Sequence, residues 1–134
     1  RADRINWEKI GEVRSRLTLP VIANGEIWRW EDGQACLKAT GCEDLMVGRG
    51  ALNIPNLSLV LKQNCEKMSW TDIQKILQKY AEMENFHDSG FYHVARIKQW
   101  LRYLNKEYPE ADIVFERIKT CQTAEDLRER LCQY

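Results

Sequence analysis

Two short apolar segments, each ending in a glycine turn, constrain most strongly what this chain can fold into. The residues VIA at 21–23 run into Gly25, and the residues LMV at 45–47 run into Gly48. An amphipathic helix is expected between them, over residues 31–39. Short apolar strands separated by helices are typical of parallel βαβ units, whose strands are buried on both faces.

The remainder of the first half adds helices to these strands. Residues 7–17 have the spacing of an amphipathic helix that Pro20 ends. Residues 51–62 are expected to form a loop and then a helix, with Pro55 near the helix start. The sequence therefore predicts an α/β arrangement up to about residue 62.

From about residue 69 the strand pattern disappears and only helical spacing remains. Ser69 is expected to cap one helix, and Thr123 and Asp126 have the spacing of a capping box at the start of another. We expect helices behind Ser69 and over residues 92–106, 111–119 and 124–132. The predicted fold class is therefore α/β plus all-α, the second part being a helical bundle.

The two glycine turns are candidates for a phosphate cradle. They are ANGE at 23–26 and VGRG at 47–50. Ligands of parallel α/β folds bind at the carboxyl ends of strands, where both turns are expected. Glycine lets backbone N–H groups approach an anion, and Arg49 can add charge-assisted hydrogen bonds. The alternative is that both are only the tight turns that a βα connection requires.

The long helix expected over residues 92–106 carries a basic and aromatic face. Lys98, Arg102 and Lys106 recur every four residues with no acidic residue among them. Cations interleaved with aromatic and amide groups suit RNA, although a solvated helix face is the alternative. Arg96, Gln99 and Tyr103 occupy the remaining arc, Trp100 borders the core stripe, and the expected core stripe is Val94, Ile97, Leu101 and Leu104.

Charge and cysteine content exclude several classes of site. The 20 basic and 20 acidic residues give a net charge of zero, so a nucleic-acid surface has to come from local clustering. The five cysteines form no CxxC pair and neither histidine lies near them at metal-ligand spacing, which predicts reduced thiols, no metal site and a cytoplasmic protein. No segment is apolar enough to predict a membrane span. Asp88, Ser89 and His93 are interpreted as a turn and a packed or exposed ring, not as a catalytic triad.

Several segments together resemble bacterial tRNA-dihydrouridine synthases. PVIANGEI at 20–27, TGC at 40–42 and VGRGALNIPNL at 47–57 are similar to the last two strand–loop units of these enzymes. YHVARIKQWL at 92–101 and the opening RAD at 1–3 resemble the C subfamily in particular. The resemblance covers nearly all of the chain and is weakest after Cys121.

The resemblance implies a flavin enzyme that uses FMN and NADPH to reduce a uridine of the tRNA D-loop, uridine 16 in the C subfamily, to 5,6-dihydrouridine. It implies an eight-fold TIM-type β/α barrel followed by a helical domain. Residues 1–64 would be the carboxyl-terminal part of the FMN-binding barrel, and residues 65–134 the tRNA-binding domain. The implied FMN-binding residues are Asn24, Gly25, Glu26, Gly48 and Arg49, and the implied tRNA-binding residues are Arg1, Arg96, Lys98, Gln99, Trp100, Arg102, Tyr103 and Lys119.

The family's general acid is a cysteine in an Asn-x-Gly-Cys-Pro loop, and none of the five cysteines has that context; Cys65 is followed by Glu66. We therefore expect no catalytic residue in this chain, which resembles the carboxyl-terminal portion of such an enzyme and should be inactive alone. The 134 residues are also too few for a complete barrel, which needs about 250. Two strands of an open barrel leave unpaired edges, so we expect self-association.

Two other classes of protein fit the same features. One is a non-catalytic helical RNA-binding or interaction module on an α/β scaffold. The other is a different phosphate-binding barrel enzyme that shares only the two glycine turns. An Asn-x-Gly-Cys-Pro loop upstream of Arg1 would separate the synthase from both.

Overall fold

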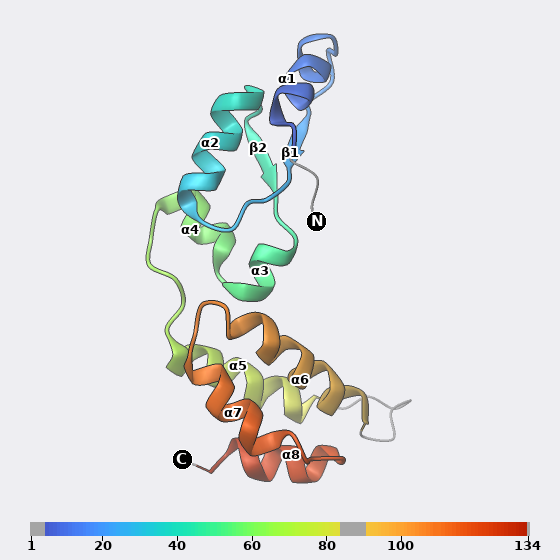
Figure 1. Ribbon diagram of the computed structural model, residues 1–134, viewed down its shortest axis with the longest axis vertical. Helices are drawn as coiled ribbons and strands as arrows, with labels where there is room; N and C mark the ends of the chain where they lie inside the picture. Colours follow the sequence, from blue (N-terminus) through green and yellow to red (C-terminus); the bar gives the residue numbers. More distant parts are fainter. Residues whose placement is uncertain (1–4, 84–90, 134) are drawn as a thin grey trace. The chain divides into compact units, whose positions relative to one another are not determined.

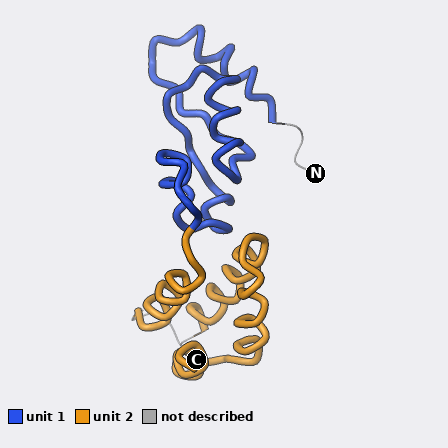
Figure 2. Tube along the Cα trace, turned by 90° about the vertical axis from the view of Figure 1, so that its left-hand side faces the viewer, with its two compact units in different colours: residues 1–67 blue, residues 68–134 orange. Residues whose placement is uncertain are grey.

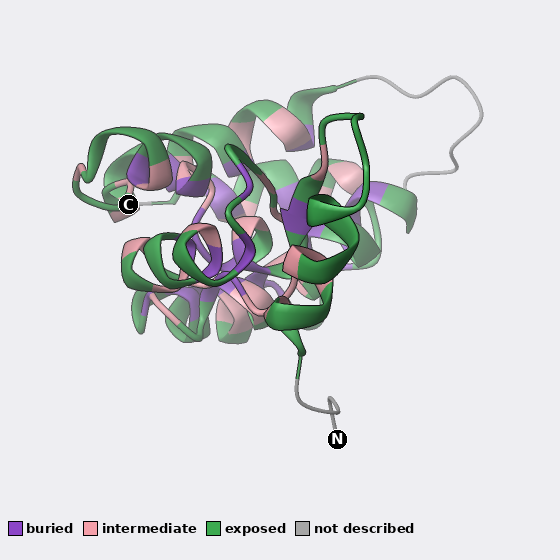
Figure 3. Ribbon diagram, turned by 90° about the horizontal axis from the view of Figure 1, so that it is seen from above, coloured by how far each residue is buried: buried purple, intermediate pink, exposed green. Residues whose placement is uncertain are grey.

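The chain forms two compact units, residues 1–67 and residues 68–134 (Figure 2). The computed structural model describes residues 5–83 and 91–133. Within each unit the buried residues lie on the inward sides of the helices (Figure 3). Among these residues, each hydrophobic cluster draws its members from one unit.

The first unit combines a parallel two-stranded sheet with helices (Figure 1). In chain order its elements are α1 (Trp7–Ser15), β1 (Ile22–Asn24), α2 (Trp30–Thr40), β2 (Asp44–Met46), α3 (Arg49–Asn53) and α4 (Leu57–Gln63). The expected βαβ order is therefore present. Gly41, at φ +69°, ends α2 in the left-handed conformation that glycine favours.

One face of the sheet is covered, and the other is open. Ala23 of β1 is fully buried and packs in a cluster with Cys36 of α2 and Leu45 of β2. Ile22 and Met46 are 55% and 56% exposed. The prediction that both faces are buried is therefore wrong, because the described residues of this unit supply a helical layer on one side of the sheet only.

Three predicted boundaries also differ from the structure. Each strand lies one residue away from its predicted segment, and α1 ends at Ser15, before the expected Leu17. Residues 51–62 form parts of two helices, not a loop and one helix. Pro55 accounts for this division, because a proline pushes the residue before it out of the helical region, and Ile54 has φ −127° and ψ 99°.

The second unit is all-helical. It contains α5 (Trp70–Glu82), α6 (Phe91–Leu104), α7 (Glu110–Ile118) and α8 (Ala124–Leu131). The predicted caps are present, since the Ser69 hydroxyl accepts from the N–H of Asp72 and the Thr123 hydroxyl from that of Asp126.

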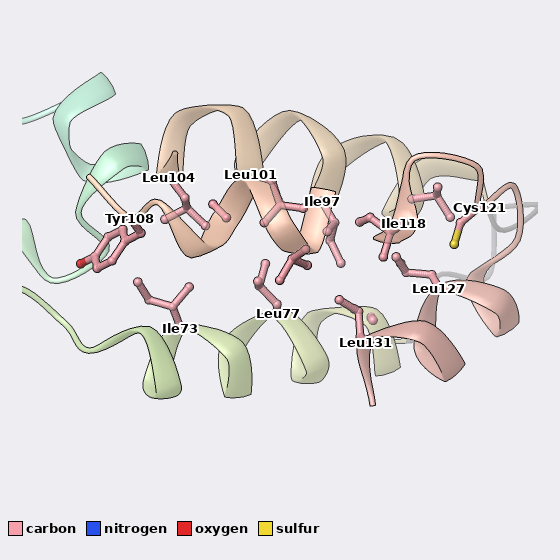
Figure 4. Packing of buried hydrophobic residues seen from close by; sticks show 14 residues of the cluster. Ile73, Leu77, Ile97, Leu101, Leu104, Tyr108, Ile118, Cys121, Leu127 and Leu131 are labelled. Carbon is pink, nitrogen blue, oxygen red and sulfur yellow. The ribbon is translucent and has the colours of Figure 1, made fainter. Parts of the chain in front are cut away.

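The four helices enclose one hydrophobic core (Figure 4). The predicted stripe of α6 is buried in it, and Ile97 and Leu104 are completely inaccessible. Leucines at Leu77 of α5 and Leu127 of α8 fill the same core from the other helices. His93 is buried too, with its ring centroid 4.9 Å from that of Tyr80, so its ring is packed; Asp88 and Ser89 lie outside the described residues.

Candidate phosphate pocket and candidate RNA-binding helices

The parallel register brings the two glycine turns to the same edge of the sheet. Asn24 of β1 pairs with Met46 of β2, so both chains leave the sheet side by side. A pocket of about 270 Å³ lies there. It is lined by all five predicted FMN-binding residues, together with Ile5, Ile27, Trp28, Met46, Val47 and Gly50.

Gly25 is fixed in a conformation that other residues rarely adopt. Its φ is +117°, and an added Cβ would lie 2.7 Å from Cδ1 of Ile5. The indole Nε1 of Trp7 donates to the Gly25 carbonyl at 3.0 Å, which anchors the first turn to α1. Glycine is therefore required here by the backbone and by the close contact with Ile5.

The second turn needs glycine for a different reason. An added Cβ on Gly50 would lie 2.4 Å from the carbonyl oxygen of Ile27 and 2.8 Å from Leu57. Gly50 thus lets the start of α3 pack directly on the backbone that follows the first turn. Gly48 differs, because an added Cβ would meet no heavy atom within 4 Å among the described residues.

Glu26 and Arg49 join the two turns through an ion pair. Arg49 Nη2 donates to Glu26 Oε1 at 2.9 Å, and the indole Nε1 of Trp28 donates to Glu26 Oε2 at 2.8 Å. The Arg49 guanidinium also lies over the Trp28 ring, with Cζ 5.3 Å from the ring centroid. The negative charge of Glu26 is therefore compensated by Arg49, and the pocket presents glycine backbone and a guanidinium.

This chemistry fits the phosphate end of a nucleotide-type cofactor. Glycine turns bring main-chain N–H groups to an anion, and a guanidinium forms charge-assisted hydrogen bonds with it. Within residues 5–83 and 91–133, no group of three or more His, Cys, Asp or Glu side chains is placed to hold a metal ion. The residues that line the pocket include no cysteine. Burial raises the pKa of the Cys36 and Cys121 thiols, and the free cysteines Cys36, Cys42 and Cys121 are buried.

On the second unit, the structure brings two of the predicted RNA-binding residues together. The Lys98 ammonium donates to the main-chain carbonyls of Lys119 and Cys121, at 2.9 and 2.8 Å. The Lys119 side chain forms an ion pair with Glu116. Lys98 therefore connects the basic face of α6 to the end of α7, a contact that the sequence did not predict. Glu116 of α7 places an acidic side chain next to Lys119.

The other predicted RNA-binding side chains lie along α6. Arg102 lies over the Phe115 ring of α7, with Cζ 5.6 Å from the ring centroid, and Trp100 is half-buried against the core. Gln99 and Arg96 are exposed, whereas Tyr103 is half-buried. Arg1 lies outside the described residues.

The first unit defines a parallel α/β protein with a candidate anion site at the carboxyl ends of its strands. The profile of the dihydrouridine synthase (Dus) family matches residues 1–132, and the chain belongs to this family. Among the described residues, none of the helices is long and apolar enough to cross a bilayer.

Curated relatives show high sequence identity to the chain. It is 79% identical over 131 residues to the tRNA-dihydrouridine(16) synthase of Haemophilus influenzae, 63% identical over 131 residues to that of Pasteurella multocida, and 52% identical over 127 residues to that of Escherichia coli K12. These alignments cover 98%, 98% and 95% of this chain. They span 42%, 42% and 40% of the relatives' own lengths.

Sequence reasoning missed the contacts that three residues of the pocket make. Ile5 packs against Gly25, Trp28 contacts both Glu26 and Arg49, and Gly50 contacts Ile27. Gly50 was visible as part of the VGRG turn, but its close packing was not. The contacts of Ile5 and Trp28 join residues of different elements, so no local sequence pattern marks them.

Proposed function

We propose that this chain is part of a flavin-dependent tRNA-dihydrouridine synthase that reduces uridine 16 in the D-loop of tRNA to 5,6-dihydrouridine, with FMN as cofactor and NADPH as reductant. The observation that carries the proposal is the meeting of two glycine turns and Arg49 around one pocket. The names of the relatives support the substrate and the position of the uridine.

The residues of the pocket would hold the FMN phosphate. Gly48 leaves space for the anion to approach the backbone, Gly25 gives the first turn its left-handed conformation, and Arg49 would bind the oxygens of the anion. Bound FMN supplies the hydride chemistry, which no side chain provides. This part of the site binds and orients the cofactor, and the proton donor is expected to lie on residues outside this chain.

The second unit would bind the tRNA. The proposed contacts are those implied by the family resemblance, among which Arg102 is exposed on α6; the helix ends at Leu104, so exposed Lys106 lies in the turn after it and not on the helix as expected. A cation neutralises a phosphate, and exposed aromatic and amide groups contact bases and sugars. Lys98 and Lys119 would contribute at the point where α6 meets the end of α7.

We further propose that the chain corresponds to the carboxyl-terminal portion of the synthase, with the barrel strands first and the tRNA-binding helices after them. The open face of the sheet, with Ile22 and Met46 exposed, supports a first unit that completes its burial against further barrel strands or another copy. Free cysteines are compatible with the proposed cytoplasmic location.

Titration of the 134-residue chain with FMN and with riboflavin tests the phosphate assignment. Because the two ligands differ only in the phosphate, FMN should bind more tightly and should shift NMR signals of Gly25, Gly48 and Arg49. Equal binding of the two ligands would contradict a phosphate site at these turns.

An assay with FMN, NADPH and unmodified tRNA tests the location of the catalytic cysteine. The chain alone should yield no dihydrouridine. Product formation would place the proton donor within these residues and overturn that part of the proposal.

A further inference from the structure

We propose that Trp28 is a positioning residue for the phosphate-binding arginine, and that it acts on Arg49 both directly and through Glu26. This inference rests on the proposed function of the pocket. Trp28 lies outside both glycine turns, so the resemblance of those turns to FMN-binding segments gives it no role.

Trp28 contacts both partners of the ion pair. Its indole N–H donates to one oxygen of Glu26 at 2.8 Å, and the other oxygen accepts from Arg49 at 2.9 Å. Its ring also lies under the guanidinium, 5.3 Å from Cζ to the ring centroid. The three side chains therefore form a closed arrangement in which each contacts the other two, and all three line the pocket.

The ion pair alone would not hold Arg49 in one orientation. The Arg49 side chain is 63% exposed and the Glu26 side chain 34% exposed, and solvent-exposed ion pairs contribute little by themselves. An indole donor that fixes the carboxylate, and a ring face that supports the guanidinium, reduce the number of accessible rotamers. A preorganised arginine loses less conformational freedom when it binds an anion.

Trp28 is itself fixed by the first turn of α2. Its main-chain N–H donates to Asp32 Oδ2 at 2.9 Å, and the N–H of Arg29 donates to the same oxygen at 3.0 Å. The orientation of Arg49 is thus connected through Trp28 to the start of α2.

Glu26 is assigned a new role by the same geometry. A carboxylate repels a phosphate, so Glu26 is a poor direct ligand for one. Both of its oxygens accept hydrogen bonds, from Arg49 and from Trp28. Glu26 therefore acts through Arg49 and does not bind the anion with its side chain.

The test is a double-mutant cycle on the 134-residue chain, with FMN and riboflavin as probes. Trp28→Phe keeps an aromatic face but removes the N–H donor, and it should weaken FMN binding about threefold to tenfold, the range expected for one lost hydrogen bond. Riboflavin binding should not change. In an Arg49→Ala background, Trp28→Phe should have no further effect on FMN affinity, because a positioning residue acts only through the residue that it positions.

Trp30→Phe is the matched control. It is the same substitution two residues away, on a half-buried tryptophan that packs against the cluster of Ile54, Leu57 and Val60 and does not line the pocket. It should leave FMN affinity unchanged. If Trp28→Phe had the same effect with and without Arg49, Trp28 would be a direct ligand or a general structural residue, and the inference would be wrong.

NMR of the Arg49 side chain separates this inference from the proposed function. Without any ligand, the heteronuclear NOE of the Arg49 Nε–H group should fall in Trp28→Phe and stay unchanged in Trp30→Phe. Unchanged Arg49 motion in Trp28→Phe would overturn the positioning role. Equal binding of FMN and riboflavin by the wild-type chain would instead overturn the phosphate site, whatever the motion of Arg49.

Discussion

The Lys98 ammonium lies 2.8 Å from the main-chain carbonyl oxygen of Cys121, and this hydrogen bond ties the middle of α6 to the chain just after α7. The same ammonium donates to the Lys119 carbonyl. Carbonyl groups at a helix end lack partners within the helix, and a cation there also interacts favourably with the helix dipole. Lys98 therefore has a structural role beside its predicted contact with RNA.

Removing this ammonium should destabilise the second unit. Lys98→Met keeps the aliphatic stem but loses both hydrogen bonds, and we expect the free energy of unfolding to fall by about 1 kcal/mol. Urea denaturation measures the change. Lys75→Met, on a lysine of α5 whose ion pair with Asp72 is exposed to solvent, is the control and should change stability little; equal effects of the two variants would show that the carbonyl contacts contribute nothing.

Binding of tRNA should depend on cations that have no comparable structural role. We expect the double variant Arg102→Gln, Lys106→Gln to weaken tRNA binding and to reduce the salt dependence, with the slope falling by about 1 for each lost phosphate contact. Affinities measured over a range of salt concentrations give the slope. Lys75→Gln removes an exposed lysine of α5 that pairs with Asp72, and it should leave the slope unchanged. A wild-type slope in the double variant would identify the α6 face as merely solvated.

The two glycines of the second turn should differ in their tolerance of alanine. Gly50→Ala places a Cβ against the Ile27 carbonyl, and we expect a loss of about 1–3 kcal/mol, typical of overpacking. Gly48→Ala meets open space and should lose less. Thermal denaturation of the two variants compares them directly, and a larger loss for Gly48→Ala would refute the packing role of Gly50.

Tyr108 should make the second unit sensitive to alkaline pH. Burial, with smaller contributions from Glu107 and Glu110, raises the pKa of its phenol to about 12, above the ordinary value of 10. Below pH 10 the phenol is neutral in both states. Between about pH 10 and 12 it ionises in the unfolded state first, so the stability contribution is lost as the pH rises.

Comparison with Tyr108→Phe isolates this contribution from the titration of other groups. The free energy of unfolding of the wild-type chain should fall more steeply over that pH range than that of the variant. Parallel pH profiles would show that the phenol ionises alike in both states.

Local patterns predicted much of the fold. The caps at Ser69 and Thr123 and the buried stripe of α6 depend on residues within one or two turns of each other, so the sequence displays them. The open face of the sheet was not predictable in this way. An apolar residue such as Ile22 looks the same in a sequence whether or not a second layer covers it.

The same distinction between local and long-range features applies to the candidate site. The glycines and Arg49 were visible because turns have a local signature. The support from Ile5 and Trp28 was not, because it depends on which segments the parallel register brings together. The hydrogen bond from Lys98 of α6 to the Cys121 carbonyl was missed for the same reason, since these two residues are separated by 23 positions in the sequence.

Among the described residues each hydrophobic cluster belongs to one unit, so we expect core mutations to affect the stability of each unit separately. Substitutions at distant sites without shared partners have nearly additive effects on stability. A change in the helical core around Leu101 is therefore not expected to alter the close contact between Gly50 and Ile27. Such a division would allow the helices of the second unit to diverge in sequence while the two glycine turns of the first unit keep their geometry.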